Sequence, residues 1–487
     1  MRKAFLKRSL LSRSVLTGLV LLFTIALTAA ASEVPRLPRV AAEWEPALGA
    51  LVAWPPVVPD ELLVEITKDD RLFLLVDDEA AQREAEAKLE ELDIDLEAVD
   101  FILVGDSSSL AWPRDWGPFA LFDEEEMFHL ADPRFLDYPS ATPACKGRLY
   151  SMDILGLDPI DDDATEVVAK TLGFSNLRLP FVLTGGNALV DGHGTAFSTC
   201  VMLNENRQYL GVSKDEFFRT VEARLGISNY VIVPNFEWFG IQHIDCLLKP
   251  LDEETILVKR VPEGHPDHGT IEEIVAYLAT LTNPHDRPYR IVRIDTPPYL
   301  LGHFVANYTN SLILNKKILV PLFGIPADEA ALQTWRELMP GYEVIGFENP
   351  GSWGWSWLDA LHCRVRAMWD PEMLYMHHRR LDERVEAAPS FRVETQIRDH
   401  SGADLIEEEL KLSWRLRGNA DWQETPLKAG SDPEAFSADI SGPEPGDTVE
   451  YFLSAADRSG RHETLPRGAP EGFYTFTVAP HSGGASR

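Results

Sequence analysis

Apolar and polar positions along residues 72–347 follow one recurring layout. An apolar run of strand length is followed by a short loop, an amphipathic helical pattern and a second apolar run. The layout occurs four times, at 72–76, 79–92 and 101–104; at 209–212, 213–226 and 230–233; at 256–259, 269–281 and 289–294; and at 318–322, 327–338 and 344–347. A supersecondary unit repeated in this way is typical of a repeat architecture rather than of one open sheet.

Local signals support these units. Ser213 and Glu216 form a capping-box pattern at the start of the second helix, and Gly226 follows its end. A weaker fifth unit consists of a helical pattern at 166–172 and an apolar run at 177–183.

Polar side chains follow the closing strand of each unit. They are Asp115 within Trp112-Pro113-Arg114-Asp115, Asn187 within Gly185-Gly186-Asn187, His243 and Asp245, Asn310, and Cys363 after His362. If the units surround an axis, these positions are equivalent and meet at its centre. The pattern therefore predicts a single site built from every unit.

The stretch 239–248 carries an imidazole and a carboxylate in apolar surroundings. Ile241, His243 and Asp245 lie two residues apart, so on a strand they would share one face. Burying such a pair costs free energy unless a cationic or reactive group lies opposite.

Beyond about residue 387 the pattern changes to short strands separated by turn signals. The predicted strands are 391–397, 410–416, 436–440, 449–455 and 473–478. They predict an immunoglobulin-like β-sandwich over residues 388–487, including a short tail, with no catalytic constellation of its own.

The first residues are predicted not to belong to the fold. Basic residues precede an uncharged apolar run at 15–27, and Ala29-Ala30-Ala31 follows it. This is a signal-peptide pattern over residues 1–31, so we expect an exported protein, periplasmic or extracellular. No later stretch has the length and apolarity of a membrane span.

Net charge and cysteine content indicate which classes of ligand and which chemistry the protein can have. The chain has 487 residues and a formal net charge of −32, which disfavours nucleic acid and anionic membranes and favours cationic ligands. Its four cysteines, Cys145, Cys200, Cys246 and Cys363, contain no C-x-x-C pair. Two disulfides, one or none are compatible with the sequence, but a nucleophilic cysteine must be free.

The collected residue types indicate a reaction. Two carboxylates that face one pocket repel each other unless a cation lies between them, and a planar guanidinium suits both. A cysteine thiolate attacks an sp2 carbon, and a neighbouring histidine transfers the protons. Together they suggest deimination of a guanidino group through an S-alkylthiouronium intermediate.

The ordered motifs also resemble those of the guanidino-group-modifying (pentein) superfamily, in particular its agmatine deiminase and bacterial peptidylarginine deiminase branch. The resemblance lies in Ala42-Glu43-Trp44-Glu45-Pro46, Trp112 to Pro118, Thr184 to Asn206 with its GGN and DGHGT, Gln242-His243-Ile244-Asp245, Tyr308-Thr309-Asn310 and His362-Cys363. These motifs span about residues 40 to 370 in the order found in the family.

The resemblance implies a five-bladed α/β propeller over residues 32–387 and no cofactor or metal. It further implies that Cys363 is the nucleophile and His243 the general acid and base. Asp115 and Asp245 would hold the guanidinium, and Asn310 would position the substrate or the cysteine. Trp112 would pack on the aliphatic stem of the substrate, unless it is a core tryptophan, and Asn187 is expected among the substrate-binding residues.

Two features depart from the family pattern. Trp353, Trp355 and Trp357 precede the cysteine where agmatine deiminases have a glycine run, and they either wall a groove or fill core. In the secreted peptidylarginine deiminase, closely spaced arginines bind a terminal carboxylate. Here Arg134 and Arg148 are not adjacent, so a preference for C-terminal arginine is not predicted.

Peptidyl-arginine is the expected substrate, with agmatine or free arginine as the alternative. An exported binding protein of the same fold is a second reading. A metal hydrolase using His243, Asp245, Cys246 and His362 matches no zinc-ligand spacing. We also expect a perturbed, partly exposed Cys363 thiol that a haloacetamidine alkylates faster than the other cysteines. The oligomeric state stays open.

Overall fold

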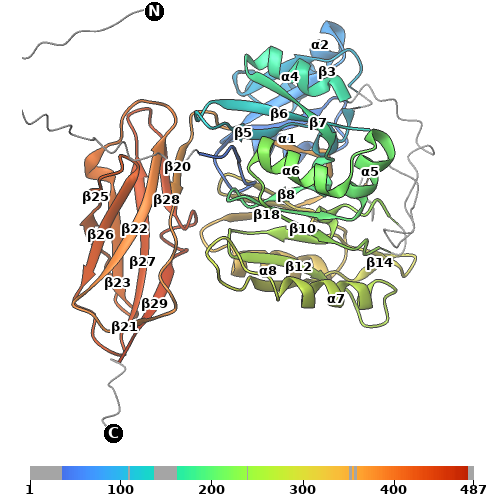
Figure 1. Ribbon diagram of the computed structural model, residues 1–487. Helices are drawn as coiled ribbons and strands as arrows, with labels where there is room; N and C mark the ends of the chain where they lie inside the picture. Colours follow the sequence, from blue (N-terminus) through green and yellow to red (C-terminus); the bar gives the residue numbers. More distant parts are fainter. Residues whose placement is uncertain are drawn as a thin grey trace, which may run out of the picture. The chain divides into compact units, whose positions relative to one another are not determined.

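Each predicted unit contributes a small sheet in which a helix lies between two parallel strands along the chain (Figure 1). The computed structural model describes residues 36–107, 110–136, 162–237, 240–349, 354–355 and 359–480. Residues from Leu37 onward belong to one unit. The predicted signal peptide at 1–31 lies outside the described residues.

Five sheets share one pairing scheme. In each, a strand that pairs antiparallel with its neighbour lies beside a parallel pair. Four of them are β1 (Arg39–Val40), β5 (Phe119–Phe122), β6 (Phe128–Arg134) and β7 (Ser175–Val182); β8 (Leu189–Val190), β9 (Thr195–Thr199) and β10 (Asn229–Val233); β11 (Leu248–Pro250), β12 (Thr255–Arg260) and β13 (Arg290–Asp295); and β16 (Leu312–Leu314), β17 (Lys317–Leu322) and β18 (Glu343–Glu348).

The fifth sheet joins distant parts of the sequence. It contains β2 (Ala47–Ala53), β3 (Arg71–Val76), β4 (Val99–Leu103) and β19 (Arg366–Trp369), in the order β19-β2-β3-β4. Arg366 of β19 pairs with Leu51 of β2, so residues just after Cys363 are hydrogen-bonded to a strand near the start of the described chain.

Helices between the strands bury one face against the sheets. They are α1 (Asp60–Ile66), α2 (Glu79–Glu91), α4 (Ala164–Leu172), α5 (Val201–Leu210), α6 (Lys214–Leu225), α7 (His268–Leu278) and α8 (Ala327–Leu338). In α8, Ala331, Leu332 and Trp335 pack against Ile318 and Val320 of β17. Fully burying side chains of the size of Leu or Ile contributes about 1.5–3 kcal/mol each.

The predicted strand at 209–212 is wrong. Its first two residues end α5, and Gly211 follows in the left-handed region at φ 68°, where its amide donates to Arg207 O. The strand that pairs in parallel with β10 is instead β9, whose polar Thr and Ser residues hid its burial in the sequence pattern. The following helix was predicted correctly, because Ser213 Oγ accepts from Glu216 N and Gly226 ends it.

The C-terminal strands form two further sheets, orange to red in Figure 1. One orders β20 (Leu374–His377), β22 (Ser390–Asp399), β26 (Ala435–Ser441) and β25 (Lys428–Ala429); the other orders β21 (Arg384–Glu386), β29 (Tyr474–Ala479), β27 (Thr448–Ala456), β23 (Lys411–Leu416) and β24 (Gln423–Pro426), with β28 (His462–Leu465) on β27. Burial alternates along β22, as expected of a strand with one face in a core.

Strands before residue 388 already join these sheets, since β20 pairs with β22 and β21 with β29. The smaller elements are the hairpin β14 (Pro298–Leu300) and β15 (Phe304–Val305), and the 3-10 turns η1 (Leu96–Ala98) and η8 (Glu407–Glu409). In the described part of the chain, no helix combines the length and the apolar character that crossing a membrane requires.

Candidate active site

Asp115 lies on a single helical turn, α3 (Pro113–Trp116), which begins at a proline. Its side chain is buried, and Oδ1 lies 3.5 Å from Nδ1 of His243. The two residues are far apart in sequence, so this contact brings two of the predicted site residues together.

Gly186, in the turn η5 (Gly185–Asn187), leaves the space that these groups share. A Cβ atom added there would lie 2.7 Å from His243 Nδ1, 2.8 Å from Asp115 Oδ1 and 3.3 Å from Asp245 Oδ2. Three polar side chains from two segments therefore surround one point that only a glycine leaves open.

The alternation predicts a strand through His243 and Asp245, but neither residue lies on one. Gln242 is in the left-handed region at φ 62°, His243 precedes the 3-10 turn η6 (Ile244–Cys246), and β11 begins only at Leu248. The amide of Ile244 donates to Oδ1 of Asn187 at 3.2 Å, which fixes the turn by a tertiary contact. Both side chains nevertheless reach the site.

Burial shapes the titration of this pair. It lowers the pKa of His243 to about 4, although Asp245 acts in the opposite direction, so the imidazole is neutral at pH 7. Burial acts to raise the pKa of Asp245, but the contacts with His362 and His243 outweigh it and lower that pKa overall. Asp245 is thus a buried carboxylate.

Cys363 lies at the centre of the turn η7 (His362–Arg364), beside Asn310 and Asp245. The side-chain amide of Asn310 donates to Cys363 Sγ at 3.3 Å, and Sγ lies 3.7 Å from Asp245 Oδ2. The Asn310 amide also lies 3.7 Å from the sulfur of Cys246. Cys246 and Cys363 are both free thiols.

The expectation of a partly exposed Cys363 is wrong, because its side chain is only 1% exposed. The Cys246 thiol lowers its pKa, but burial together with Asp245, Asp115 and Asp359 raises the pKa to about 11. Cys363 is therefore a thiol at neutral pH as long as no cation binds to the carboxylates around it.

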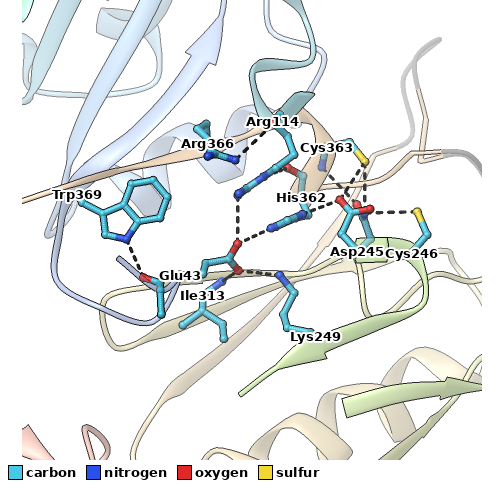
Figure 2. Close-up of polar contacts among 12 residues, drawn as sticks. Glu43, Arg114, Asp245, Cys246, Lys249, Ile313, His362, Cys363, Arg366 and Trp369 are labelled. Carbon is cyan, nitrogen blue, oxygen red and sulfur yellow. Dashed lines mark hydrogen bonds and ion pairs between the residues drawn. The ribbon is translucent and has the colours of Figure 1, made fainter. Parts of the chain in front are cut away.

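A buried ionic chain lies behind the site (Figure 2). His362 Nδ1 hydrogen-bonds to Asp245 Oδ2 at 2.8 Å, and its Nε2 contacts Glu43 Oε2. Glu43 also pairs with Lys249 at 2.7 Å and Arg114 at 3.3 Å. These contacts outweigh burial and hold the pKa of Glu43 well below its usual range.

Two carboxylates on one imidazole require a proton between the ring and each of them. Burial and the neighbouring Arg114 nonetheless lower the pKa of His362. The chain therefore holds Asp245 through Oδ2, the same oxygen that lies 3.7 Å from Cys363 Sγ. The sequence pattern did not predict this role of Glu43; its only signal was the motif Ala42 to Pro46.

Asn187 and Trp112 both have protein partners. Asn187 Oδ1 accepts from Thr199 N and Oγ1 at 2.9 and 3.1 Å as well as from Ile244 N. Trp112 is half-buried, and its indole N–H donates to Asp359 at 2.8 Å. Their predicted contacts with substrate stay predictions.

The remaining expectations fall partly outside the described residues. Trp355 is buried and donates to Phe347 O at 2.7 Å, so it fills core, whereas Trp353 and Trp357 are not described. Arg134 lies 3.8 Å from Asp162, and Arg148 is not described. Cys200 is disulfide-bonded, and Cys145 lies outside the described residues.

Two groups of side chains have metal-ligand chemistry within the described chain. One is Asp245, Cys246 and Cys363, inside the site; the other is His193, Glu253 and His377, away from it. The site itself contains a cysteine thiol, two carboxylates and a neutral imidazole, which are the groups that attack on a cationic sp2 carbon requires.

Comparison with known proteins identifies relatives that have a similar sequence and fold. A Shewanella frigidimarina protein assigned as an agmatine deiminase is 28% identical over 280 residues, which are 50% of this chain and 70% of the relative. A crystal structure of a Porphyromonas gingivalis protein assigned as an arginine deiminase superposes with a TM-score of 0.55 at 21% identity, covering 69% of this chain and 99% of the other.

The agmatine deiminase of Enterococcus faecalis superposes with a TM-score of 0.53 at 17% identity, covering 69% and 96% of the two chains. The region described above thus has the α/β pentein fold of these deiminases. The family model described as Porphyromonas-type peptidyl-arginine deiminase matches residues 39–363, which end at the predicted nucleophile. The chain belongs to this family of hydrolases, which act on the carbon–nitrogen bonds of guanidino groups.

Proposed function

We propose that this protein is an exported deiminase that hydrolyses the guanidino group of peptidyl-arginine to citrulline and ammonia. The observation that carries the proposal is the space beside Gly186, where Asp115, Asp245 and His243 meet. Cys363 Sγ lies 3.7 Å from Asp245 Oδ2 at the edge of the same space.

Binding would neutralise the two carboxylates. A guanidinium placed between Asp115 and Asp245 donates N–H groups to both and supplies the positive charge that they lack. The same charge offsets the carboxylates that raise the pKa of Cys363. Substrate binding therefore favours the thiolate that the free enzyme disfavours.

The chemistry then needs one proton shuttle. Cys363 Sγ bonds to the guanidinium carbon, and the thiol proton passes through His243 to the departing nitrogen, which leaves as ammonia. Water next gives a proton to His243 and attacks the thiouronium carbon. The C–S bond breaks and the proton on His243 returns to the sulfur. The hydroxyl proton of the forming ureido group passes to solvent, where ammonia takes it up as ammonium, and the ureido product leaves.

Two substrate classes fit this centre. The description of the matching family model names peptidyl-arginine, which favours a peptide substrate. The curated relatives are assigned as agmatine deiminases, which favours the small amine as the second candidate. A binding protein without chemistry is the third reading.

One experiment separates all three readings. Ureido product would be measured from benzoyl-arginine ester, agmatine and free arginine, with wild type and with Cys363→Ala. We expect product from the blocked arginine, little from agmatine and none from Cys363→Ala. Product from agmatine alone would reverse the substrate assignment, and no product from any of them would favour a binding protein.

We further propose that the five sheets surround the site as the blades of a propeller and that the two C-terminal sheets form an immunoglobulin-like domain.

Export would follow from the signal-peptide pattern at 1–31. Mass spectrometry of the protein produced in a bacterial host tests whether the chain is exported and cleaved. A mature chain that begins near residue 32 outside the cytosol supports export, whereas an intact amino terminus in the cytosol contradicts it.

A further inference from the structure

Three histidines and a glutamate converge at a second place in the structure. His193 Nδ1 or Nε2, a carboxylate oxygen of Glu253 and a ring nitrogen of His377 all lie within 4.8 Å of one another. His285 joins them, because its Nε2 lies 3.7 Å from Glu253 Oε1 and its ring stacks on that of His377 with centroids 5.5 Å apart.

The four residues come from four separate segments. His193 lies in the turn before β9, Glu253 between β11 and β12, His285 between α7 and β13, and His377 at the end of β20. Side chains from such distant positions gather only where the fold holds them. The cluster is therefore a property of the folded chain and not of one acidic loop.

The backbone around two of these side chains is fixed by hydrogen bonds. Asp191 Oδ1 accepts from His193 N at 2.8 Å and from Thr195 N at 2.9 Å, and Gly192 and Gly194 take the positive φ values that this turn requires. Asn283 Oδ1 accepts from His285 N at 2.9 Å. The turn containing His193 is the DGHGT motif, and none of the residues described above at the deiminase centre belongs to it.

The ring nitrogens are available as ligands. Nε2 of His285 and Nε2 of His377 are buried and, within the described chain, have no hydrogen-bond partner. An imidazole nitrogen without a hydrogen-bond partner can bind a metal ion through its lone pair.

The carboxylate of Glu253 supplies the oxygen ligand, within 4.8 Å of the ring nitrogens of His193 and His377. His193, Glu253 and His377 also line a cleft of about 730 Å³, which gives an ion a route to the cluster.

We propose that His193, His285, His377 and Glu253 form a binding site for one divalent transition-metal ion, with zinc as the best match. Three imidazoles and one carboxylate are a typical zinc set, and ligands at about 2.0–2.2 Å in a tetrahedron lie roughly 3.4 Å apart. The 3.7 Å separation of His285 and Glu253 is close to this value. The bound ion would tie three segments around the deiminase region to β20.

The test uses the full-length protein, freed of metal with a chelator and titrated with Zn²⁺ and Co²⁺. We expect one ion per chain by calorimetry. The cobalt form should show visible d–d absorption without a thiolate charge-transfer band, because this site has no sulfur. A strong thiolate band would place the ion at Cys246 and Cys363 and overturn the proposal.

Variants assign the ligands. His193→Ala and His377→Ala should each weaken Zn²⁺ binding at least about 100-fold, and Zn²⁺ should raise the melting temperature of wild type but not of these variants. Glu253→Gln keeps the side-chain shape and should lose affinity too. His462→Ala removes an exposed histidine of β28 as the matched control. Wild-type affinity in both histidine variants would refute the site.

Discussion

The side chain of Asn310 holds Cys363 from two directions. Its amide nitrogen donates to Sγ at 3.3 Å, while its Oδ1 accepts from the backbone amide of Cys363 at 3.4 Å. The backbone oxygen of Asn310 also accepts from His362 N at 3.1 Å. One asparagine thus fixes both the position of the turn that contains Cys363 and the hydrogen bond to its sulfur.

Asn310→Ala removes both contacts. A hydrogen bond to a group that becomes charged contributes about 1.5–3 kcal/mol, so kcat should fall roughly 10- to 100-fold with a smaller change in KM. Steady-state kinetics on a blocked arginine checks this. Asn419→Ala, on an exposed turn, serves as the control, and an unchanged kcat in Asn310→Ala would contradict the assigned role.

The Asp115 carboxylate contributes, after burial and Asp245, to raising the pKa of Cys363 to about 11. Asp115→Asn removes that negative charge, so the thiolate becomes easier to form and the pKa falls. The pH profile of alkylation of Cys363 by neutral iodoacetamide should move to lower pH, even though substrate turnover is lost. Asp421→Asn, an exposed carboxylate, should leave the profile in place.

Gly186 admits no side chain, because a methyl group would lie within 2.8 Å of both Asp115 and His243. Gly186→Ala should lower kcat/KM by at least about 1,000-fold, the size of a loss of transition-state stabilisation near 4 kcal/mol. Gly264→Ala, which meets no atom within 4 Å, is the matched control. Near-normal kinetics in Gly186→Ala would show that substrate does not occupy this space.

Glu43 neutralises buried cations behind the site. Glu43→Gln leaves Lys249 and Arg114 without their carboxylate, and breaking a buried pair costs about 3 kcal/mol or more. Urea unfolding should show this loss of stability as a lower midpoint. Glu84→Gln, on the exposed face of α2, should change the free energy of unfolding by less than about 0.5 kcal/mol.

The sequence allowed a correct prediction where local signals decide the structure. Helix α8 lies at the predicted residues, and α6 begins and ends at its predicted caps. The prediction of a strand through His243 failed because the turn depends on Asn187, a residue distant in sequence. Neither the contact of Glu43 with His362 nor that of Cys246 with Cys363 leaves a periodic signal in the sequence.

The pairing of β19 with β2 has a consequence for when the enzyme becomes active. Cys363 is followed within three residues by Arg366, which pairs with Leu51, and Glu43 lies just ahead of β2. A chain that ends before Trp369 is therefore expected to lack the complete β19 that holds Cys363 beside the carboxylates. We expect deiminase chemistry only from a folded chain that contains the whole region through β19.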